Sequence, residues 1–193
     1  MNRFENWVCS SAFWRRMTQR EVLPWLLKGA ELGEHVLELG AGAGPATPEL
    51  RRRAPRVTSL DYSHAFALKI ARAANGEMGR NGAVLQGDAS ALPFPDSTFS
   101  TAIAVLMLHH LQSREAQERA FREIFRVLRP GGVFLALDLP DGWLHRVAHI
   151  RSTFVPVAPA SAPQRLGAAG FANVALDFRR GAFRIQAHRP ANS

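Results

Sequence analysis

The sequence predicts an α/β fold in which a mainly parallel sheet is covered by helices on both faces. Strand-like and helix-like segments alternate from residue 35 to residue 138, which is typical of consecutive β-α-β units. The first strand-like segment, Val36–Leu39, leads through three closely spaced glycines into a helix-like segment. Two short strand-like segments near the end of the chain are separated by only two residues. They predict an antiparallel hairpin that closes the sheet.

Five strands and three helices are expected in the alternating region. The predicted strands are 35–39, 57–61, 83–86, 101–106 and 133–138, and the predicted helices are 45–53, 63–75 and 113–128. Ser113 is expected to cap the last of these helices, because its side chain can accept a hydrogen bond from the first turn. Pro130-Gly131-Gly132 is expected to end that helix and turn the chain into the fifth strand.

The flanking segments predict one helix before the sheet and a short α/β extension after it. Ser10–Leu27 has helical apolar spacing and is expected to bend or split near Pro24. A Pro- and Ala-rich stretch, 155–163, precedes a short predicted helix at 164–169 and the two hairpin strands, 173–179 and 182–188. With 193 residues, we expect a single domain: a helical lid at 1–30, a core at 31–140 and a C-terminal helix with the hairpin at 141–193.

Composition and charge exclude several protein classes. The chain is 47% hydrophobic and 21% charged, as in an ordinary globular protein, and its one cysteine, Cys9, excludes an intrachain disulfide. No apolar stretch approaches the roughly 20 residues that a bilayer-spanning helix needs, and the start lacks a secretory layout, so we expect a cytoplasmic protein. The net charge of +8 comes from scattered arginines, which favours solvated helix faces over a nucleic-acid surface.

The glycine loop after the first strand is typical of a nucleotide-type cofactor site. Gly40, Gly42 and Gly44 allow backbone angles closed to other residues and let a ligand lie against the main chain. A dinucleotide loop would place its third glycine where Pro45 stands, so pyrophosphate binding is disfavoured. Asp61 ends the second strand, 61 − 40 = 21 residues after the first glycine, where a carboxylate can accept both hydroxyls of a ribose.

Further segments in the same order carry a family resemblance. Gly87-Asp88-Ala89 follows the third strand, Leu92–Phe99 leads into the fourth, and Leu108-His109-His110-Leu111 comes after it. With these motifs, the chain resembles the class I S-adenosylmethionine-dependent methyltransferases of the type 11 group, which includes relatives of the quinone-biosynthesis methyltransferases. The matching segments extend from about Val36 to Leu139, and Gly170-Phe171 and the final hairpin also fit.

The resemblance implies a Rossmann-like, seven-stranded, mostly parallel sheet whose last strand is antiparallel. It also implies a cofactor, S-adenosylmethionine, which leaves as S-adenosylhomocysteine. Glu38 and the loop Gly40–Gly44, with Ala41, would face the methionine part, Asp61 the ribose and Tyr62 the adenine. Asp88 and Ala89 would bind the adenine edge, and Ala104 and Val105 would border the sulfonium. Ser100 departs from the aspartate of many relatives, at a position expected to lie outside the cofactor pocket.

Two groups of histidines are candidates for chemistry. His109 and His110, just past the fourth strand, are the nearest candidates for a base that takes a proton from the acceptor, although adjacent histidines often serve only packing. Asp141, His145 and His149 would share one helix face, as metal ligands can. We expect no metal there, because Asp141 can cap a helix and this kind of methyl transfer needs none.

The N-terminal segment carries four aromatic residues and a methionine, and this set has three interpretations: Trp7, Phe13, Trp14, Met17 and Trp25. They would bury one helix against the sheet, or form a lid that favours an apolar or ring-bearing acceptor. With Arg15, Arg16 and Arg20 beside them, they would alternatively form an interfacial helix at a membrane surface.

The leading functional hypothesis is a methyltransferase for a small, apolar or ring-bearing acceptor. The alternatives are a non-catalytic S-adenosylmethionine-binding partner or regulatory module, and a lipid or quinone methyltransferase at the membrane surface. Nucleic-acid or protein methylation is disfavoured, because the chain lacks the Asn-Pro-Pro-aromatic motif of many amine-directed enzymes. Neither the methylated atom nor the oligomeric state follows from the sequence.

Overall fold

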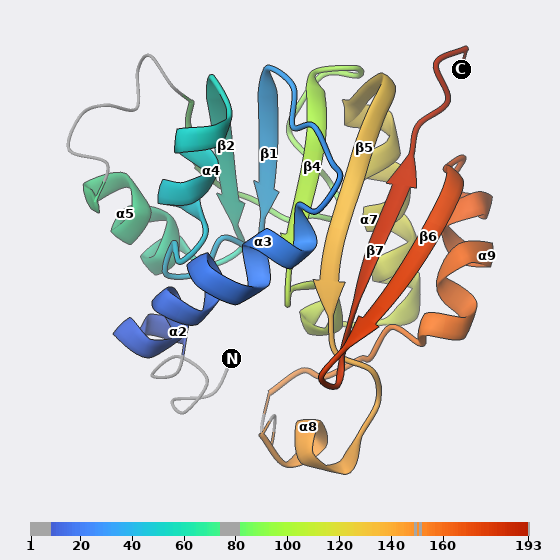
Figure 1. Ribbon diagram of the computed structural model, residues 1–193. Helices are drawn as coiled ribbons and strands as arrows, with labels where there is room; N and C mark the ends of the chain where they lie inside the picture. The colour runs from blue at the N-terminus through green and yellow to red at the C-terminus, as the bar shows by residue number, and fades with distance from the viewer. Residues whose placement is uncertain (1–8, 74–81, 149, 151, 193) are drawn as a thin grey trace.

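A single seven-stranded sheet forms the centre of the computed structural model, which describes residues 9–73, 82–148, 150 and 152–192 (Figure 1). The strand order is β3-β2-β1-β4-β5-β7-β6. The strands are β1 His35–Leu39, β2 Arg56–Asp61, β3 Val84–Gln86, β4 Phe99–Val105, β5 Leu128–Asp138, β6 Ala172–Arg179 and β7 Ala182–His188. All seven predicted strands are therefore confirmed.

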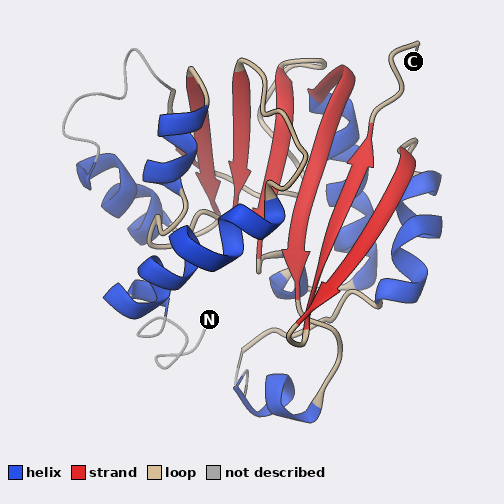
Figure 2. Cartoon of the chain, in the orientation of Figure 1, coloured by secondary structure: helices blue, strands red, loops and turns tan. Residues whose placement is uncertain are grey.

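Helices cover both faces of this sheet (Figure 2). On one face lie α2 Ala12–Met17, the π-helical turn η1 Thr18–Val22, α3 Leu23–Leu26 and α4 Thr47–Arg53. On the other lie α7 Arg114–Val127 and α9 Ala162–Ala168, which follows the 3-10 turn η3 Pro159–Ser161. The remaining helical elements are α5 His64–Ala73 beside β2 and β3, η2 Leu108–His110 after β4, and α8 Trp143–Ala148, which projects beyond the sheet.

Strand direction confirms the predicted topology. Strands β1 to β5 pair in parallel, while β7 pairs antiparallel with both β5 and β6. The turn between β6 and β7 consists of Arg180 and Gly181, whose φ angles are +49° and +79°. Two consecutive positive φ values match the right-handed twist of a two-residue hairpin, so this turn sets the register of the last strands.

Several element boundaries differ from the prediction, most of them by one or two residues, and the differences at α4 and β5 have a clear structural cause. Helix α4 begins at Thr47 and not at Pro45, because the glycine loop continues to Gly44, whose φ is +77°. Strand β5 begins at Leu128 and not at Val133, so Pro130-Gly131-Gly132 lies within the strand region at an irregular step of the β4–β5 pairing. The N–H of Gly131 donates to the carbonyl of Arg189, which extends the pairing with the chain after β7.

The N-terminal segment splits near Pro24 as predicted, with a π-helical turn between α2 and α3. Leu23 and Leu26 of α3 are fully buried in the core beneath this face of the sheet, whereas α2 buries no residue. Burial against the sheet is therefore the observed role of α3, and α2 is left on the surface.

The topology brings five strand ends to one edge of the sheet. Because β1 to β5 are parallel, the chain leaves each of them on the side toward which the arrows point in Figure 1. The glycine loop, Asp61, Asp88, Val105 and Asp138 all follow or end strands there. In open α/β sheets ligands bind at this carboxyl edge, so it is the place to look for a site. Within the part of the chain that the structure describes, no helix is long and apolar enough to cross a bilayer.

Candidate functional site

The glycine loop lies against β2 and is tied to it by its own backbone. The N–H groups of Gly40 and Ala41 donate to the carbonyl of Leu60, with N···O distances of 2.8 and 3.2 Å. The N–H of Gly44 donates to the carbonyl of Ala41 at 2.9 Å. Because these N–H groups are already bonded within the protein, the loop offers a ligand mainly its carbonyl oxygens and the bare main chain of its glycines.

Two glycines in this loop are required for different reasons. Gly40 has a φ of +64°, and a Cβ added to it would lie 2.2 Å from Cγ of Met107, so the loop and the segment after β4 approach too closely for a side chain. Gly42 has a φ of +56°, but its added Cβ would meet nothing nearer than the Gly40 carbonyl oxygen at 4.0 Å. The space over Gly42 is therefore open, as a cofactor lying on the main chain requires.

Asp61 connects the end of β2 to the glycine loop. Its Oδ2 accepts the N–H of Gly42 at 2.7 Å and its Oδ1 accepts the N–H of Ser63 at 2.8 Å. Burial raises the pKa of Asp61, and these two hydrogen bonds oppose that rise. Each carboxylate oxygen has a second lone pair, so Asp61 can hold the loop and still accept hydrogen bonds from a ligand.

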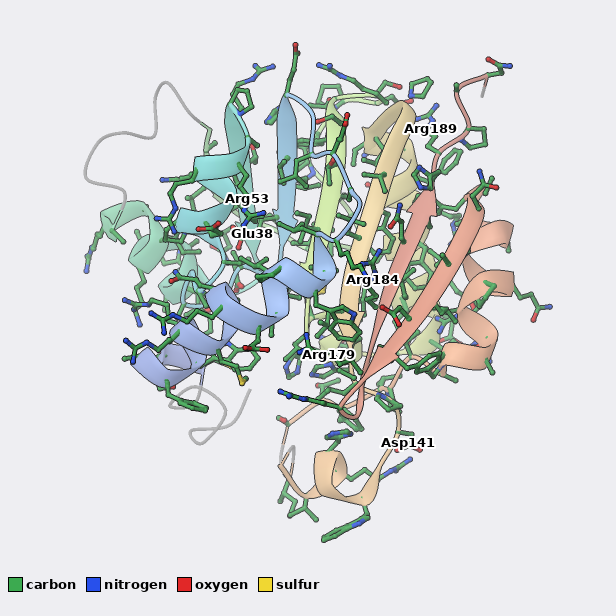
Figure 3. All side chains as sticks on the ribbon, in the orientation of Figure 1. Glu38, Arg53, Asp141, Arg179, Arg184 and Arg189 are labelled. Atoms are coloured by element: carbon green, nitrogen blue, oxygen red, sulfur yellow. The ribbon has the colours of Figure 1, made fainter. Side chains whose placement is uncertain are left out.

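Glu38 lies inside the molecule near the carboxyl end of β1, beneath α4 (Figure 3). Its Oε2 accepts the hydroxyls of Thr47 at 2.8 Å and Ser59 at 2.6 Å, which joins β1, β2 and α4. Burial raises the pKa of Glu38 to about 7, although the hydrogen bonds from Ser59 and Thr47 act in the opposite direction. Glu38 therefore changes between its neutral and charged forms near neutral pH.

The residues predicted to contact the adenine follow β2 and β3. Tyr62 is 71% exposed, directly after Asp61. Asp88 is exposed and its Oδ1 accepts both the N–H and the hydroxyl of Ser90 at 2.8 Å, while Ala89 is buried. This arrangement leaves the aromatic ring of Tyr62 accessible at the carboxyl edge.

The end of β4 places a strained residue beside the glycine loop. Ala104 is buried and Val105 is half-buried at the end of the strand. The next residue, Leu106, has a φ of +51°, a conformation that costs a branched side chain of this kind about 1 kcal/mol or more. This turn directs the chain into Met107, whose side chain packs over Gly40. No residue pattern in the sequence predicts this strain.

His109 pairs with a carboxylate, Asp138, that was not among the predicted site residues. Its Nδ1 lies 2.5 Å from Oδ1 of Asp138, and both side chains are buried. Asp138 ends β5, and its carboxylate also accepts the N–H groups of Leu139 at 2.7 Å and His109 at 3.3 Å. The half-buried His110 has its Nδ1 3.2 Å from the carbonyl of Thr153. An acidic residue at the end of the fifth strand was the available signal, because parallel neighbours end at the same edge.

Comparison with known protein families identifies the family of this chain. The family model described as a methyltransferase domain matches residues 37–136, just over half of the chain. The chain belongs to the type 11 group of class I S-adenosylmethionine-dependent methyltransferases. Its matched region begins in β1 and ends in β5, and so includes the glycine loop, Asp61 and His109.

Curated relatives and solved structures agree with this family. The chain is 36% identical over 121 residues to a demethylmenaquinone methyltransferase of Thermobifida fusca, with 62% of this chain and 47% of that protein covered. It is 35% identical over 115 residues to the ubiquinone/menaquinone biosynthesis C-methyltransferase UbiE of Cronobacter sakazakii. This match covers 57% of this chain and 44% of that protein. The chain therefore spans less than half the length of these relatives. A SAM-dependent methyltransferase structure from Aquifex aeolicus matches in fold with a TM-score of 0.74, 20% identity and coverage of 98% and 99%.

The residues at the carboxyl edge of this chain fit S-adenosylmethionine, the cofactor of its family. The open space over Gly42 leaves room on the main chain, and the Asp61 carboxylate beside it has lone pairs for hydroxyl donors. Ser100 lies at the opposite end of β4, where its hydroxyl contacts the carbonyls of Leu32 and His35 at 2.8 and 2.9 Å. This departure from the family pattern is therefore remote from the carboxyl edge.

The residues considered for a metal site have other partners. Asp141 pairs with Arg146 through bonds of 2.7 and 2.6 Å, and Nδ1 of His145 lies 2.9 Å from the carbonyl of Pro140. His149 lies outside the described residues. Among the residues that are described, no group of three or more His, Cys, Asp or Glu side chains is arranged to hold a metal ion.

Proposed function

We propose that this chain transfers the methyl group of S-adenosylmethionine to a small, apolar or ring-bearing acceptor. The observation that carries the proposal is the geometry at the carboxyl edge. There Oδ2 of Asp61 accepts the N–H of Gly42 at 2.7 Å, and the space above Gly42 is open. The relatives named for demethylmenaquinone and ubiquinone/menaquinone biosynthesis support a ring-bearing acceptor. We expect the reaction to take place in the cytoplasm, and no metal to be needed.

The chain would bind the cofactor along the carboxyl edge. Glu38 and the loop Gly40–Gly44, including Ala41, would face the methionine part, and Asp61 would accept the ribose hydroxyls. Tyr62, Asp88 and Ala89 would surround the adenine. When bound, S-adenosylmethionine supplies a methyl group that is already activated by positive sulfur. Ala104 and Val105 would border this group and exclude water, so the main task of the protein is alignment.

His109 and Asp138 would handle the proton that an acceptor hydroxyl, amine or activated carbon must lose. If Nδ1–H donates to Asp138, the imidazole is fixed in the tautomer whose Nε2 accepts a proton. Asp138 would then stabilise the charged imidazolium. His110 is the alternative base. The N-terminal segment would act as the lid over the acceptor, because Gln19 in η1 already donates to the carbonyl of Pro45 at 3.2 Å.

The first experiment is calorimetric titration with S-adenosylmethionine, S-adenosylhomocysteine and, as a control, NADH. Binding of the two sulfur compounds but not of NADH is expected. Radiolabelled methyl transfer to hydroquinones and phenols then tests the activity, with His109→Gln and His110→Gln measured over a pH range. Binding without transfer to any acceptor would favour the alternative, a non-catalytic cofactor-binding module. Full turnover in both histidine variants would exclude both as the base.

A further inference from the structure

Exposed apolar side chains gather at one edge of this molecule. Among the described residues, seven large hydrophobic side chains are strongly exposed, and five of them lie on α2, on or just after α8, or at the β6–β7 hairpin tip. These five are Phe13, Trp143, Val147, Ile150 and Phe178. A sixth, Tyr62, follows β2 at the same carboxyl edge, so only Leu68 on α5 lies elsewhere. Such a concentration marks an interaction surface, because scattered exposed residues would show no preferred edge.

Helix α8 presents the largest of these side chains away from the sheet. Trp143 and Val147 are four residues apart, so they share one face of the helix, and they are 72% and 54% exposed. The helix projects beyond the ends of the strands (Figure 1). The pairing of Asp138 with Phe183 places the hairpin tip at this same edge. Phe178, close to the tip, is 62% exposed.

The same edge carries an excess of positive charge. Arg15, Arg16 and Arg180 are exposed and have no ion-pair partner in the part of the chain that the structure describes. Of the other arginines, Arg179 at the hairpin tip is paired with Glu21 at 3.3 Å and Arg146 with Asp141 at 2.6 Å. The unmatched arginines thus give the apolar side chains basic neighbours, in a chain whose net charge is already +8.

We propose that this edge, formed by α2, α8 and the β6–β7 tip, docks on the surface of an anionic phospholipid bilayer. Exposed aromatic and aliphatic side chains mixed with arginine are the composition of an interfacial membrane surface. The apolar groups come from three separate segments around the site, and this pattern suits a bilayer better than a single partner helix, which needs a continuous groove. The biological role of this docking rests on the proposed function. A docked molecule would turn its acceptor site toward apolar substrates that are held in the membrane.

The test is co-sedimentation of the full chain with vesicles of phosphatidylcholine, with and without about a third phosphatidylglycerol, at low and high salt. We expect binding to the anionic vesicles that weakens at high salt, and much weaker binding to the neutral ones. The Trp143→Ser/Val147→Ser variant should lower the partition coefficient by about tenfold or more. Arg180→Glu should lower the partition coefficient by at least about fivefold, because one arginine near an anionic surface contributes about 1 kcal/mol to binding.

Matched controls separate this edge from the rest of the surface. Leu68→Ser removes an exposed apolar residue on α5, and Arg129→Glu reverses an arginine near the opposite end of β5; both should bind vesicles like the unmodified chain. Absence of binding to anionic vesicles, equal binding to neutral vesicles, or unchanged binding of the Trp143/Val147 variant would overturn the proposal. So would self-association in sedimentation velocity that this variant abolishes. Calorimetry with S-adenosylmethionine on the same preparations keeps this outcome separate from a failure of the proposed function.

Discussion

At the scale of single residues, two of the buried carboxylates at the carboxyl edge, Asp61 and Glu38, have structural roles besides the binding roles proposed for them. Asp61 holds the N–H groups of Gly42 and Ser63, and Glu38 holds the hydroxyls of Thr47 and Ser59. Both groups are buried, so their charge depends on these partners and on whatever binds above them. Substitutions at these positions must therefore be read together with a measurement of stability.

Replacing Asp61 by alanine should weaken binding of S-adenosylmethionine by about 2–4 kcal/mol, because it removes two charge-assisted hydrogen bonds to the ribose and loosens Gly42. S-adenosylhomocysteine, which has the same ribose, should lose as much. Calorimetry measures both losses, and circular dichroism checks the fold. Asp96→Ala, which removes an exposed carboxylate, serves as the control. Unchanged affinity in a folded Asp61 variant would end the ribose assignment.

The open space over Gly42 gives a sharper test of where the cofactor lies. Gly42→Ala and Gly29→Ala both place a side chain at positive φ, +56° and +72°, without a close contact. Each should lower stability by about 1 kcal/mol. Only Gly42→Ala should also reduce cofactor affinity, by at least about tenfold, because its methyl group occupies cofactor space. Denaturant titration and calorimetry compare the two variants, and equal affinities would place the cofactor elsewhere.

The raised pKa of Glu38 predicts a pH-dependent stability. The folded-state pKa of about 7 exceeds the ordinary 4.5, so the folded state holds the proton more tightly. The stabilising contribution is complete below pH 4.5 and is lost as the pH rises to about 7, a loss of about 3 kcal/mol. In Glu38→Gln, whose amide does not titrate, this loss should be absent. Urea unfolding at about pH 5 and about pH 8 measures it, and the same pH dependence in both proteins would contradict the prediction.

At the scale of elements, several arginines join two elements through hydrogen bonds to backbone carbonyls, which their positions in the sequence did not predict. Arg184 donates to the carbonyls of Trp25 and Lys28 at the end of α3, and Arg189 to those of Phe125, Arg126 and Leu128 at the end of α7. The prediction of solvated arginines holds for Arg119 and Arg122, which are exposed on α7. It is wrong for Arg126, which is partly enclosed and bonded to the loop before β4.

Arg126 should stabilise the loop that follows Asp88. Its guanidinium donates to the carbonyls of Leu92 and Phe94 at 3.0 and 2.8 Å and to Asp96 at 2.7 Å. Arg126→Ala is expected to lower the free energy of unfolding by about 1–3 kcal/mol, and Arg126→Lys to restore little of it, since an ammonium group cannot make the same fork of bonds. Arg122→Ala, on the same helix, should change stability by less than about 0.5 kcal/mol. If both alanine variants lowered the free energy of unfolding by a similar amount in denaturant titrations, the stabilising role of Arg126 would be rejected.

Periodicity predicted the elements well but said little about contacts between them. The strand 35–39 and the hairpin strand 182–188 were placed at their observed bounds, because short apolar segments flanked by turn residues leave little choice. The pairing of His109 with Asp138 was missed, since the two residues are 29 positions apart and meet only because β4 and β5 end together. The ribose role of Asp61 came from its position and spacing, and the cofactor-binding roles of Glu38 and Asp88 came from the family resemblance; all three stay predictions.

At the scale of the whole molecule, one sheet joins every part of the described chain. The N-terminal α3 packs on it through Leu23 and Leu26, and the C-terminal β7 lies between β5 and β6. Two buried clusters cover its two faces, without a linker that divides them. We therefore expect the lid, core and C-terminal segments to unfold together.

A single unfolding transition makes the cofactor's effect on thermal stability a test of the whole proposal. A ligand that binds only the folded state at about 100 times its Kd adds about 2.7 kcal/mol, which raises the Tm of a chain of this size by about 5–10 °C. S-adenosylhomocysteine should produce this shift in calorimetric scans of the unmodified chain and of Gly29→Ala, whereas at the same concentration Gly42→Ala, which binds about tenfold more weakly, should show no more than about half of it. Two separate transitions, of which only one moved, would show that the cofactor core folds apart from the remainder. Because Gln19 connects η1 to the glycine loop through Pro45, the single shift is the expected result: ordering the loop also stabilises the N-terminal segment.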